Sequence, residues 1–390
     1  MLNNIELNSL YSKEEIILIL ISRLYFGKCL CSDVEDFIAN EKISWEEVYK
    51  IASEHGIRSF IYSVVINHHL VIDNEVKKRF KRFYNNTKVK NFNQLRFASN
   101  LFNVFKEEGV NVIPYKGVFF AVDYYSDWAA RESVDVDFLI DKKDALFIEN
   151  YCKTKSYSGL TTIPTNYLNY HQRFFKDLVY LVPSIKSSLE IHWRLLDRFS
   201  GKFPTYNFFI PHMQPYQKDD LKIDKLLPTY DFLIMASNHY VKDLSIKFKS
   251  LIDMACIVTQ KGDLIDSNVI KSCAKKFEFE KRLNLGLDLL DDILGINFLV
   301  SSRERLSAEQ LRMPLSVKLP RLYIDEPNFI RLSLKLQDNF FCKIKFLCRC
   351  FAYYLLPTYT DINESRASNY GLPILFLMRP FRIVYHAFKR

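Results

Sequence analysis

Glycine is scarce in this chain, at 10 of 390 residues, and the sequence contains no internal repeat and no low-complexity tract. This scarcity argues against a loop-rich or repeat-based all-β protein. Apolar runs are short, and none approaches the roughly 20 residues that a membrane-spanning helix needs. Ile16–Ile21 is apolar, but it follows acidic residues and precedes no small-residue cleavage site, so we expect no signal peptide. These absences predict a cytoplasmic protein.

Common catalytic signatures are also missing. The sequence has no Walker A motif, no G-x-G-x-x-G, no H-E-x-x-H and no G-x-S-x-G elbow. Eight cysteines are present, but Cys29/Cys31 and Cys348/Cys350 are each separated by a single residue, whereas zinc sites use roughly two to four. We therefore expect buried free thiols in a reducing compartment rather than a zinc knuckle.

Aromatic residues and positive charge, in contrast, are plentiful. The 32 Phe and 23 Tyr supply ample material for a buried core. The formal net charge is +9, and residues 331–390 carry ten Lys or Arg against three Asp or Glu. This basic C-terminal region suits contact with nucleic acid, an anionic lipid surface or an acidic partner, and it also suits an ordinary solvated helical face.

The pattern of predicted elements changes twice along the chain. Residues 12–108 are predicted to be helical, with capping boxes at Ser12 and Ser44, a stop at Gly56 and a long helix over Asn91–Glu108 that ends at Gly109. Short β-prone runs then alternate with two helices, Val118–Ser126 and Asp144–Lys155. The expected strands are Val110–Tyr115, Val134–Ile140, an antiparallel pair formed by Tyr167–Asp177 and Leu178–Pro183, and Ser188–Trp193.

After Pro228 the chain is predicted to return to helices, the first of which contains His239. Residues 300–330 contain three prolines and are expected to form an irregular connection. A basic, aromatic helix is predicted over Phe340–Leu356, ended by Pro357, and the last segment, Gly371–Arg390, is apolar and basic.

Asp135 and Asp137 are the strongest candidates for chemistry. They lie in the run Asp-Val-Asp-Phe-Leu-Ile, and residues i and i+2 of a strand project to the same face. Glu190, in Leu-Glu-Ile-His-Trp on a neighbouring strand, could complete a cluster of three carboxylates. Carboxylates this close cannot all ionise without compensation, which a divalent cation such as Mg²⁺ supplies. For the Asp pair alone, a solvated acidic strand face is the alternative interpretation.

Basic residues near these carboxylates could hold phosphate. In Lys116-Gly117, glycine lets a backbone amide approach a phosphate, the following helix adds its dipole and Lys116 adds a charge. Arg131 could pair with a triphosphate, orient an aspartate or form an ordinary salt bridge. His192 shares a face with Glu190 and could bind a phosphate or a carboxylate, or be a core histidine.

Three further polar residues are weaker candidates for a functional role. His171, on the predicted antiparallel pair, could line the same cleft. His239 and Asp253 lie in the second helical half, where we expect a structural pair or one on the substrate side.

The order Lys-Gly, helix, Arg, Asp-x-Asp, hydrophobic run and Glu-x-His-Trp resembles the uncharacterised bacterial nucleotidyltransferases of the DNA polymerase β-like superfamily. The resemblance covers roughly residues 15–385 and extends to Ile51–Ile57 and Leu251–Asp253. The wider superfamily has Gly-Ser or Gly-Gly at the turn and a shorter gap to the Asp pair. Here Val118 follows Gly117 and Asp135 lies eighteen positions beyond Gly117, a departure that the uncharacterised family shares.

This resemblance implies an α+β fold: a polymerase β-like nucleotidyltransferase core, with a small mixed β-sheet and helices, over 109–227, between helical regions over 1–108 and 228–390. It implies metal-dependent transfer of a nucleoside monophosphate from an NTP to an acceptor, with release of pyrophosphate. Asp135, Asp137 and Glu190 would be catalytic and would hold Mg²⁺ or Mn²⁺. The nucleotide-binding residues would be Lys116, Gly117, Arg131 and His192.

Other functions fit the same sequence. A catalytically silent relative could bind nucleotide or RNA through its basic C-terminal region, although three intact carboxylates argue against silence. A toxin-like or regulatory transferase would use the same chemistry on a protein or a tRNA. A lipid-surface protein would use Phe340–Leu356 and Gly371–Arg390. The sequence does not distinguish the acceptors, because one fold supports many of them.

Overall fold

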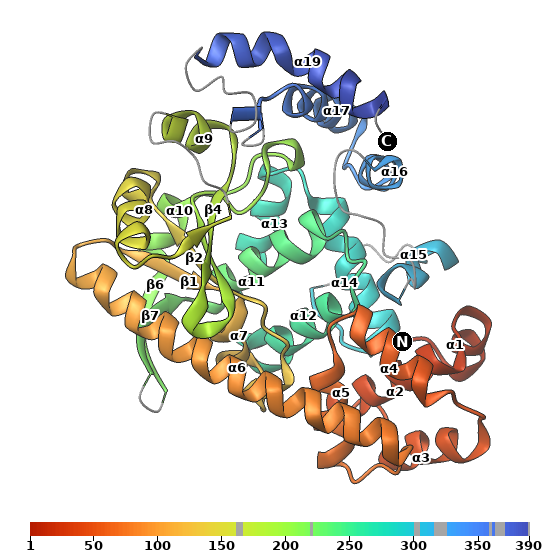
Figure 1. Cartoon of the computed structure of the whole chain (residues 1–390). Helices are drawn as coiled ribbons and strands as arrows, with labels where there is room; N and C mark the ends of the chain where they lie inside the picture. Colours follow the sequence, from red (N-terminus) through yellow and green to blue (C-terminus); the bar gives the residue numbers. More distant parts are fainter. Residues whose placement is uncertain are drawn as a thin grey trace.

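The computed structural model of the chain describes residues 1–160, 167–218, 221–299, 305–315, 326–358, 361–362 and 371–388. Helices pack around a small mixed sheet, so the fold is α+β as predicted (Figure 1). Within these ranges, every helix is too short or too polar to span a bilayer.

Five short helices precede the sheet region: α1 Asn4–Leu10, α2 Lys13–Tyr25, α3 Cys31–Asn40, α4 Trp45–Glu54 and α5 Arg58–Asn67. The predicted caps are present. Ser12 forms a capping box with Glu15, the Ser44 side chain accepts a hydrogen bond at the start of α4, and Gly56 follows α4 with a φ of 66°. Local capping chemistry thus sets where these helices begin and end.

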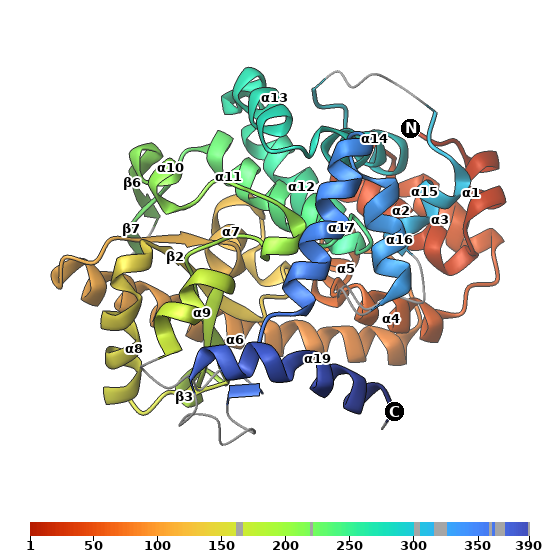
Figure 2. The same cartoon turned by 90° about the horizontal axis from the view of Figure 1, so that it is seen from above.

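The next helix, α6 (Asn74–Glu107), is 34 residues long and runs along one side of the whole molecule (Figures 1 and 2). The predicted helix over Asn91–Glu108 was therefore much too short, although its stop at Gly109 is confirmed. Few residues of the first half of α6 are buried, so its apolar stripe is narrow there and the periodicity is weak. Asp73 caps its true N-terminus.

Five strands form the main sheet in the order β1-β2-β5-β4-β3. β2 and β5 are parallel, and the other neighbours are antiparallel. Helix α7 (Gly117–Tyr124) follows β1, α8 (Ala145–Thr154) follows β2, and a separate hairpin, not predicted, joins β6 (Met213–Lys218) to β7 (Leu221–Leu226). The bounds are β1 Val112–Tyr115, β2 Asp135–Ile140, β3 Ser158–Gly159, β4 Asp177–Val182 and β5 Ser187–His192.

The two faces of the sheet differ in polarity because side chains alternate along each strand. One face is buried in a hydrophobic cluster with α6 and α8, and its central members are Val136, Phe138, Ile140, Leu189 and Ile191. The alternate residues, Asp135, Asp137 and Glu190 among them, project to the opposite face. The sheet therefore presents its acidic side chains away from this apolar layer.

The predicted antiparallel pair over Tyr167–Pro183 is wrong in its first half. Leu168–Phe174 forms a helix, α9, and only β4 is a strand, which pairs with β5. Leu168, His171 and Phe175 recur every three to four residues, a spacing that suits a helix docked by one face. His171 is thus a buried helical residue whose Nε2 lies 2.7 Å from the carbonyl oxygen of Asp177, and it does not line a cleft from a strand.

The second half of the chain is helical, as predicted. The expected irregular connection over 300–330 lies partly outside the described residues. Residues 305–315 and 326–330 of this connection are described, and there the prediction is wrong. They contain α15 (Ala308–Arg312), a 3-10 turn over Met313–Leu315 and the start of α16 at Pro327. His239 belongs to a π-helical turn, Ser237–Lys242, that continues α11 (Pro228–Ala236). The remaining helices are α10 Tyr206–Phe209, α11 Pro228–Ala236, α12 Phe248–Lys261, α13 Ser267–Lys276, α14 Glu280–Leu294, α15 Ala308–Arg312, α16 Pro327–Lys335, α17 Phe340–Tyr354 and α19 Leu372–Phe388.

The N-terminal helices and the second helical half share one hydrophobic cluster, to which Phe60 of α5, Phe248 of α12 and Leu290 of α14 all belong. The boundaries near 108 and 228 remain a prediction, and this shared core packs the segments on either side of them together. All eight cysteines are free thiols. Five of them are buried, as predicted, whereas Cys29 and Cys31 are partly exposed and Cys348 is exposed.

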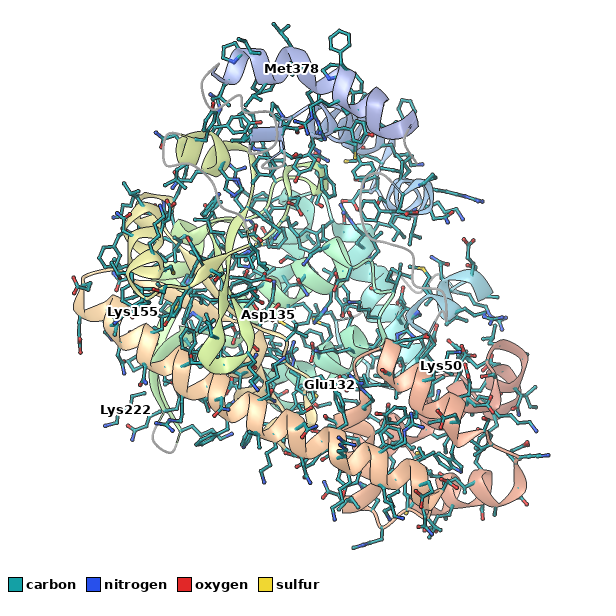
Figure 3. The ribbon with its side chains drawn as sticks, viewed as in Figure 1. Lys50, Glu132, Asp135, Lys155, Lys222 and Met378 are labelled. Carbon is teal, nitrogen blue, oxygen red and sulfur yellow. The ribbon has the colours of Figure 1, made fainter. Side chains whose placement is uncertain are left out.

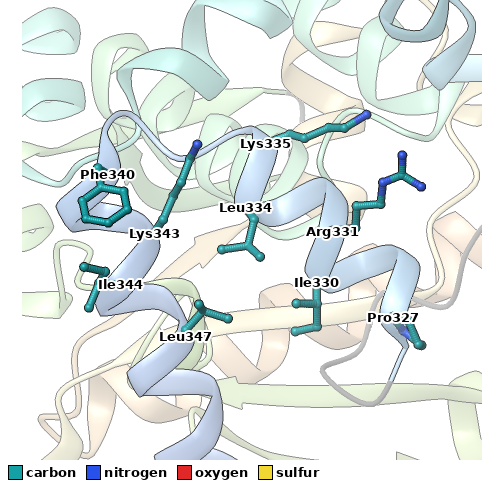
Figure 4. Close-up of a pocket in the computed structure, with 9 residues that line it drawn as sticks. All are labelled: Pro327, Ile330, Arg331, Leu334, Lys335, Phe340, Lys343, Ile344 and Leu347. Atoms are coloured by element: carbon teal, nitrogen blue, oxygen red, sulfur yellow. The ribbon is translucent and has the colours of Figure 1, made fainter.

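The C-terminal region combines charge with apolar surface. An open groove of about 780 Å³ separates α16 from α17, with Ile330, Leu334 and Leu347 facing into it and Arg331 and Lys343 at its rim (Figure 4). Much of the basic charge is already paired: Lys335 with Glu309, Lys345 with Glu278, and Arg379 and Arg382 with Asp361. The predicted nucleic-acid contact of this region remains a prediction.

A buried ion pair joins the sheet region to the second helical half. Arg131, which precedes β2, binds Asp253 of α12 through two bonds of 2.9 Å. Tyr125 and His239 also contact the Asp253 carboxylate, at 2.6 and 3.0 Å. Burial alone would raise the pKa of Asp253, but the charge of Arg131 and the bond from His239 hold it well below the ordinary value. His239 and Asp253 are thus a structural pair, one of the two expectations from the sequence.

We expect Asp253→Asn to lower the free energy of unfolding by about 3–5 kcal/mol, because it leaves the Arg131 guanidinium buried without a counter-charge. Denaturant unfolding followed by circular dichroism measures this loss. Glu75→Gln, which breaks an exposed pair with Lys78, is the matched control and should change little. Equal stability of the two variants would contradict the role given to Asp253.

Candidate active site

The strand register places two of the predicted catalytic carboxylates side by side. In the parallel pair of β2 and β5, Asp137 lies directly opposite Glu190, and Asp135 lies opposite Ser188. Tyr115 is the partner of Asp137 on β1. Asp137 is 2% exposed, and its Oδ2 has no hydrogen-bond partner among the described residues. A buried carboxylate oxygen without a partner is costly unless a ligand satisfies it.

His192 lies between these two carboxylates. Its Nε2 is 3.2 Å from Asp137 Oδ1 and 3.1 Å from Glu190 Oε2. Its Nδ1 is 3.6 Å from Asp177 Oδ2, too far for a hydrogen bond but close enough for attraction between charges. Burial would lower the pKa of His192, but its bonds to Asp137 and Glu190 raise it. The imidazolium form therefore compensates the clustered carboxylates, and a metal ion bound by the same groups would replace its proton.

Two further residues, which the sequence did not single out, complete this charge network. Asp177 is the first residue of β4 and lies directly opposite His192. Lys176 forms an ion pair with Asp177. Burial would raise the pKa of Asp177, but Lys176 and His192 lower it. One feature of the sequence could have identified Asp177. It is the polar first residue of an otherwise apolar strand, as Asp135 is on β2.

The carboxylates differ in their electrostatic environment. Burial, followed by the charges of Asp137 and Glu190, raises the pKa of Asp135 to about 6. Burial would also raise the pKa of Glu190, but its hydrogen bond with His192 and the nearby lysines hold it at about 2. Figure 3 shows Asp135 near the middle of the molecule, where the sheet approaches the helices of the second half.

The Lys116-Gly117 turn lies against the same residues. Lys116 Nζ is 3.9 Å from Asp137 Oδ1, and burial lowers the pKa of Lys116. The backbone of Lys116 has a φ of 55° and a ψ of −151°, a region that residues other than glycine rarely occupy. A Cβ on Gly117 would lie 2.9 Å from the carbonyl oxygen of Asp135. The turn is thus strained and packed directly onto the acidic strand.

Arg131 supports this turn from behind. Besides its pair with Asp253, its Nη1 donates a hydrogen bond of 2.9 Å to the carbonyl oxygen of Gly117. Arg131 is 6% exposed, so its contacts serve the backbone of the turn and α12. Its predicted contact with nucleotide remains a prediction, and the structure gives it a positioning role.

These residues form a donor set that fits a divalent cation. One ligand atom each from Asp137, Glu190 and His192 lies within 4.8 Å of the others. Asp135, predicted to be a ligand together with Asp137 and Glu190, is not in this group. After burial, the charges of Asp137 and Glu190 are the main causes of its raised pKa. Carboxylate oxygens suit Mg²⁺, and an imidazole nitrogen beside them shifts the set toward Mn²⁺ or another transition metal.

Comparisons with known proteins gave one family. Neither the curated proteins nor the solved structures contain a match to this chain. A family profile described as uncharacterised nucleotidyltransferase matches residues 41–295, a range that contains the turn, the acidic strands and Asp253. Because this match covers more than half of the 390 residues, the chain belongs to the family of uncharacterised nucleotidyltransferases.

Proposed function

We propose that the protein is a metal-dependent nucleotidyltransferase, a bacterial member of the DNA polymerase β-like superfamily, which moves a nucleoside monophosphate from an NTP to an acceptor. The observation that carries this proposal is the register of β2 and β5, which sets Asp137 opposite Glu190 with His192 between them. A buried cluster of this kind fits a cation, and the family profile supports transfer of a nucleotidyl group.

In the proposed reaction, an acceptor oxygen forms a bond to the α-phosphorus and the bond to the pyrophosphate oxygen breaks. Asp137 and Glu190 would hold Mg²⁺ or Mn²⁺, with Asp135 or His192 as the further ligand. The ion, when bound, would neutralise charge that develops on the phosphates. The Gly117 region presents backbone amides, and Lys116 presents an ammonium group, to the phosphates. A carboxylate of the cluster accepts the proton of the acceptor.

A silent nucleotide-binding relative is the second candidate. The buried group of Asp137, Glu190 and His192 argues against it, because binding without chemistry does not need this cluster. Binding of an NTP without release of pyrophosphate would favour this alternative.

We expect an NTP with Mg²⁺ or Mn²⁺ to raise the melting temperature of the wild type and not that of Asp135→Ala/Asp137→Ala. A ligand at about 100 times its Kd stabilises the native state by roughly 2.7 kcal/mol. A thermal-shift screen of the four NTPs with each metal measures this effect. Glu107→Ala/Glu108→Ala, which removes two exposed carboxylates at the end of α6, should keep the full shift. An undiminished shift in the Asp variant would refute the metal-nucleotide site.

We expect Gly117→Ala to lower kcat/KM at least about tenfold, because its Cβ would press on the Asp135 carbonyl oxygen and move the turn. Release of pyrophosphate from the NTP identified by the screen is the assay. Gly27→Ala is the matched control, since Gly27 has a similar φ of 65° but nothing within 4 Å of the added Cβ. Full activity of Gly117→Ala would show that the turn does not position substrate.

His192→Gln tests whether the imidazole is a metal ligand. We expect this variant to bind Mn²⁺ at least about tenfold more weakly, with a smaller loss for Mg²⁺, because nitrogen ligands favour the softer ion. Isothermal titration calorimetry with each metal alone measures both affinities. His55→Gln alters another buried histidine, one that accepts a bond from the Phe248 amide, and should leave both affinities unchanged. Equal losses for the two metals would assign His192 an orienting role instead.

A further inference from the structure

A second cavity, distinct from the α16–α17 groove, lies between the segment that follows β5 and helix α17. Its volume is about 580 Å³. Residues 194–205 form one wall, α17 forms another, and Phe174 of α9 and Phe277 after α13 complete the lining. A cavity of this size is in the range of small-molecule sites.

Four cationic side chains line this cavity: Arg194, Arg198, Lys202 and Arg349. None of the four forms an ion pair with a carboxylate among the residues that the structure describes. Burial, followed by the charge of Arg198, lowers the pKa of Arg194, so two of these cations repel each other. Lys345 and, more weakly, the charge of Arg349 lower the pKa of Glu278, so Arg349 is compensated in part. Four cations gathered in one cavity with so little counter-charge favour the entry of an anion.

Aromatic rings and a glycine shape the same cavity. Phe174, Phe203 and Tyr353 line it, and the Arg198 guanidinium lies 5.1 Å from the centroid of the Phe174 ring. Gly201 has a φ of 125°, which favours glycine, and the Arg349 guanidinium lies 3.6 Å from the position that a Cβ would take. Such walls suit a planar ring, which can stack on both phenyl and guanidinium groups.

The cavity is adjacent to the carboxylate cluster. Arg194 lies two residues beyond the end of β5 and four positions after Glu190. Tyr353, in the cavity wall, lies 3.5 Å from Asp197. Burial raises the pKa of Asp197, and that pKa also responds to the charges of Lys176, Asp177 and His192. One short segment therefore connects the proposed metal site to the cationic cavity.

We propose that this cavity binds an anionic small molecule that carries a planar ring, of the class of aryl phosphomonoesters. The phosphate lies among the arginines and the ring lies against the aromatic wall. In the transferase, a member of this class that also carries a hydroxyl group is the acceptor: its hydroxyl oxygen bonds to the α-phosphorus, pyrophosphate leaves, and the proton passes to a carboxylate of the cluster. This assignment rests on the proposed function, whereas the binding itself does not.

Phenyl phosphate is the probe, titrated by calorimetry into the full chain with EDTA present so that a metal site does not contribute. We expect saturable binding that weakens at least about tenfold in Arg198→Gln and in Arg349→Gln, because each loses a charge-assisted hydrogen bond. Benzyl alcohol, which has the ring alone, should not bind, and inorganic phosphate should bind more weakly than phenyl phosphate. Lys202→Gln, at an exposed position, is a further variant whose folding is not at risk.

Arg96→Gln is the matched control, because Arg96 also lies over a phenylalanine ring, Phe92, but on the exposed face of α6. Absence of phenyl phosphate binding, or binding that survives Arg198→Gln, Lys202→Gln and Arg349→Gln together, overturns the proposal. Asp135→Ala/Asp137→Ala should bind phenyl phosphate as the wild type does. If the wild type binds phenyl phosphate but no NTP, the proposed transferase function is refuted and the cavity proposal stands. If the wild type binds an NTP but not phenyl phosphate, the cavity proposal is refuted and the transferase stands.

Discussion

The cost of burying several carboxylates on one face of a sheet is the constraint on which the rest of this structure depends. Asp137, Glu190 and Asp177 all lie on or beside that face, and like charges at these distances oppose one another. Three cations offset the cost: Lys116 after β1, Lys176 before β4 and His192 on β5. Each cation comes from a different strand end, so the strand order β1-β2-β5-β4 brings compensation to the cluster from both sides.

The helical half contributes to the site through one chain of contacts. Lys116 occupies a backbone region that costs a non-glycine residue roughly 1–3 kcal/mol, and a glycine there would remove this strain. The strained turn persists because Arg131 binds the Gly117 carbonyl and Asp253 binds Arg131. Tyr125 and His239 then secure Asp253. A glycine at position 116 would relieve the strain but would remove the amine, which the proposed function uses to bind phosphate.

Local patterns allowed much of this arrangement to be predicted from sequence. Alternation within β2 and β5 correctly assigned Asp135 and Asp137 to one face, and Glu190 and His192 to one face, because the period of a strand is a local property. The opposition of Asp137 and Glu190 depends on a parallel pairing between segments about fifty residues apart, which no local pattern specifies. The same limit hid Asp177 as the neighbour of His192. The strand predicted over Tyr167–Asp177 is largely a helix instead. A short segment with closely spaced aromatic residues fits the period of a strand and that of a helix, so tertiary packing decides which one forms.

The two proposed sites have opposite charge, and this difference would determine which ligand binds at each site. The carboxylate cluster repels a free phosphate and admits one that arrives with a cation, whereas the cavity lined by Arg194, Arg198 and Arg349 attracts a free anion. An NTP-metal complex and an anionic acceptor would therefore be directed to separate places, although both carry phosphate. Asp197 links the two sites, because it lies 3.5 Å from Tyr353 of the cavity wall and its pKa, raised by burial, also responds to the charges of Lys176, Asp177 and His192. A transferase that must keep donor and acceptor phosphates apart needs such a difference in charge, because neither shape nor hydrophobicity distinguishes one phosphate from another.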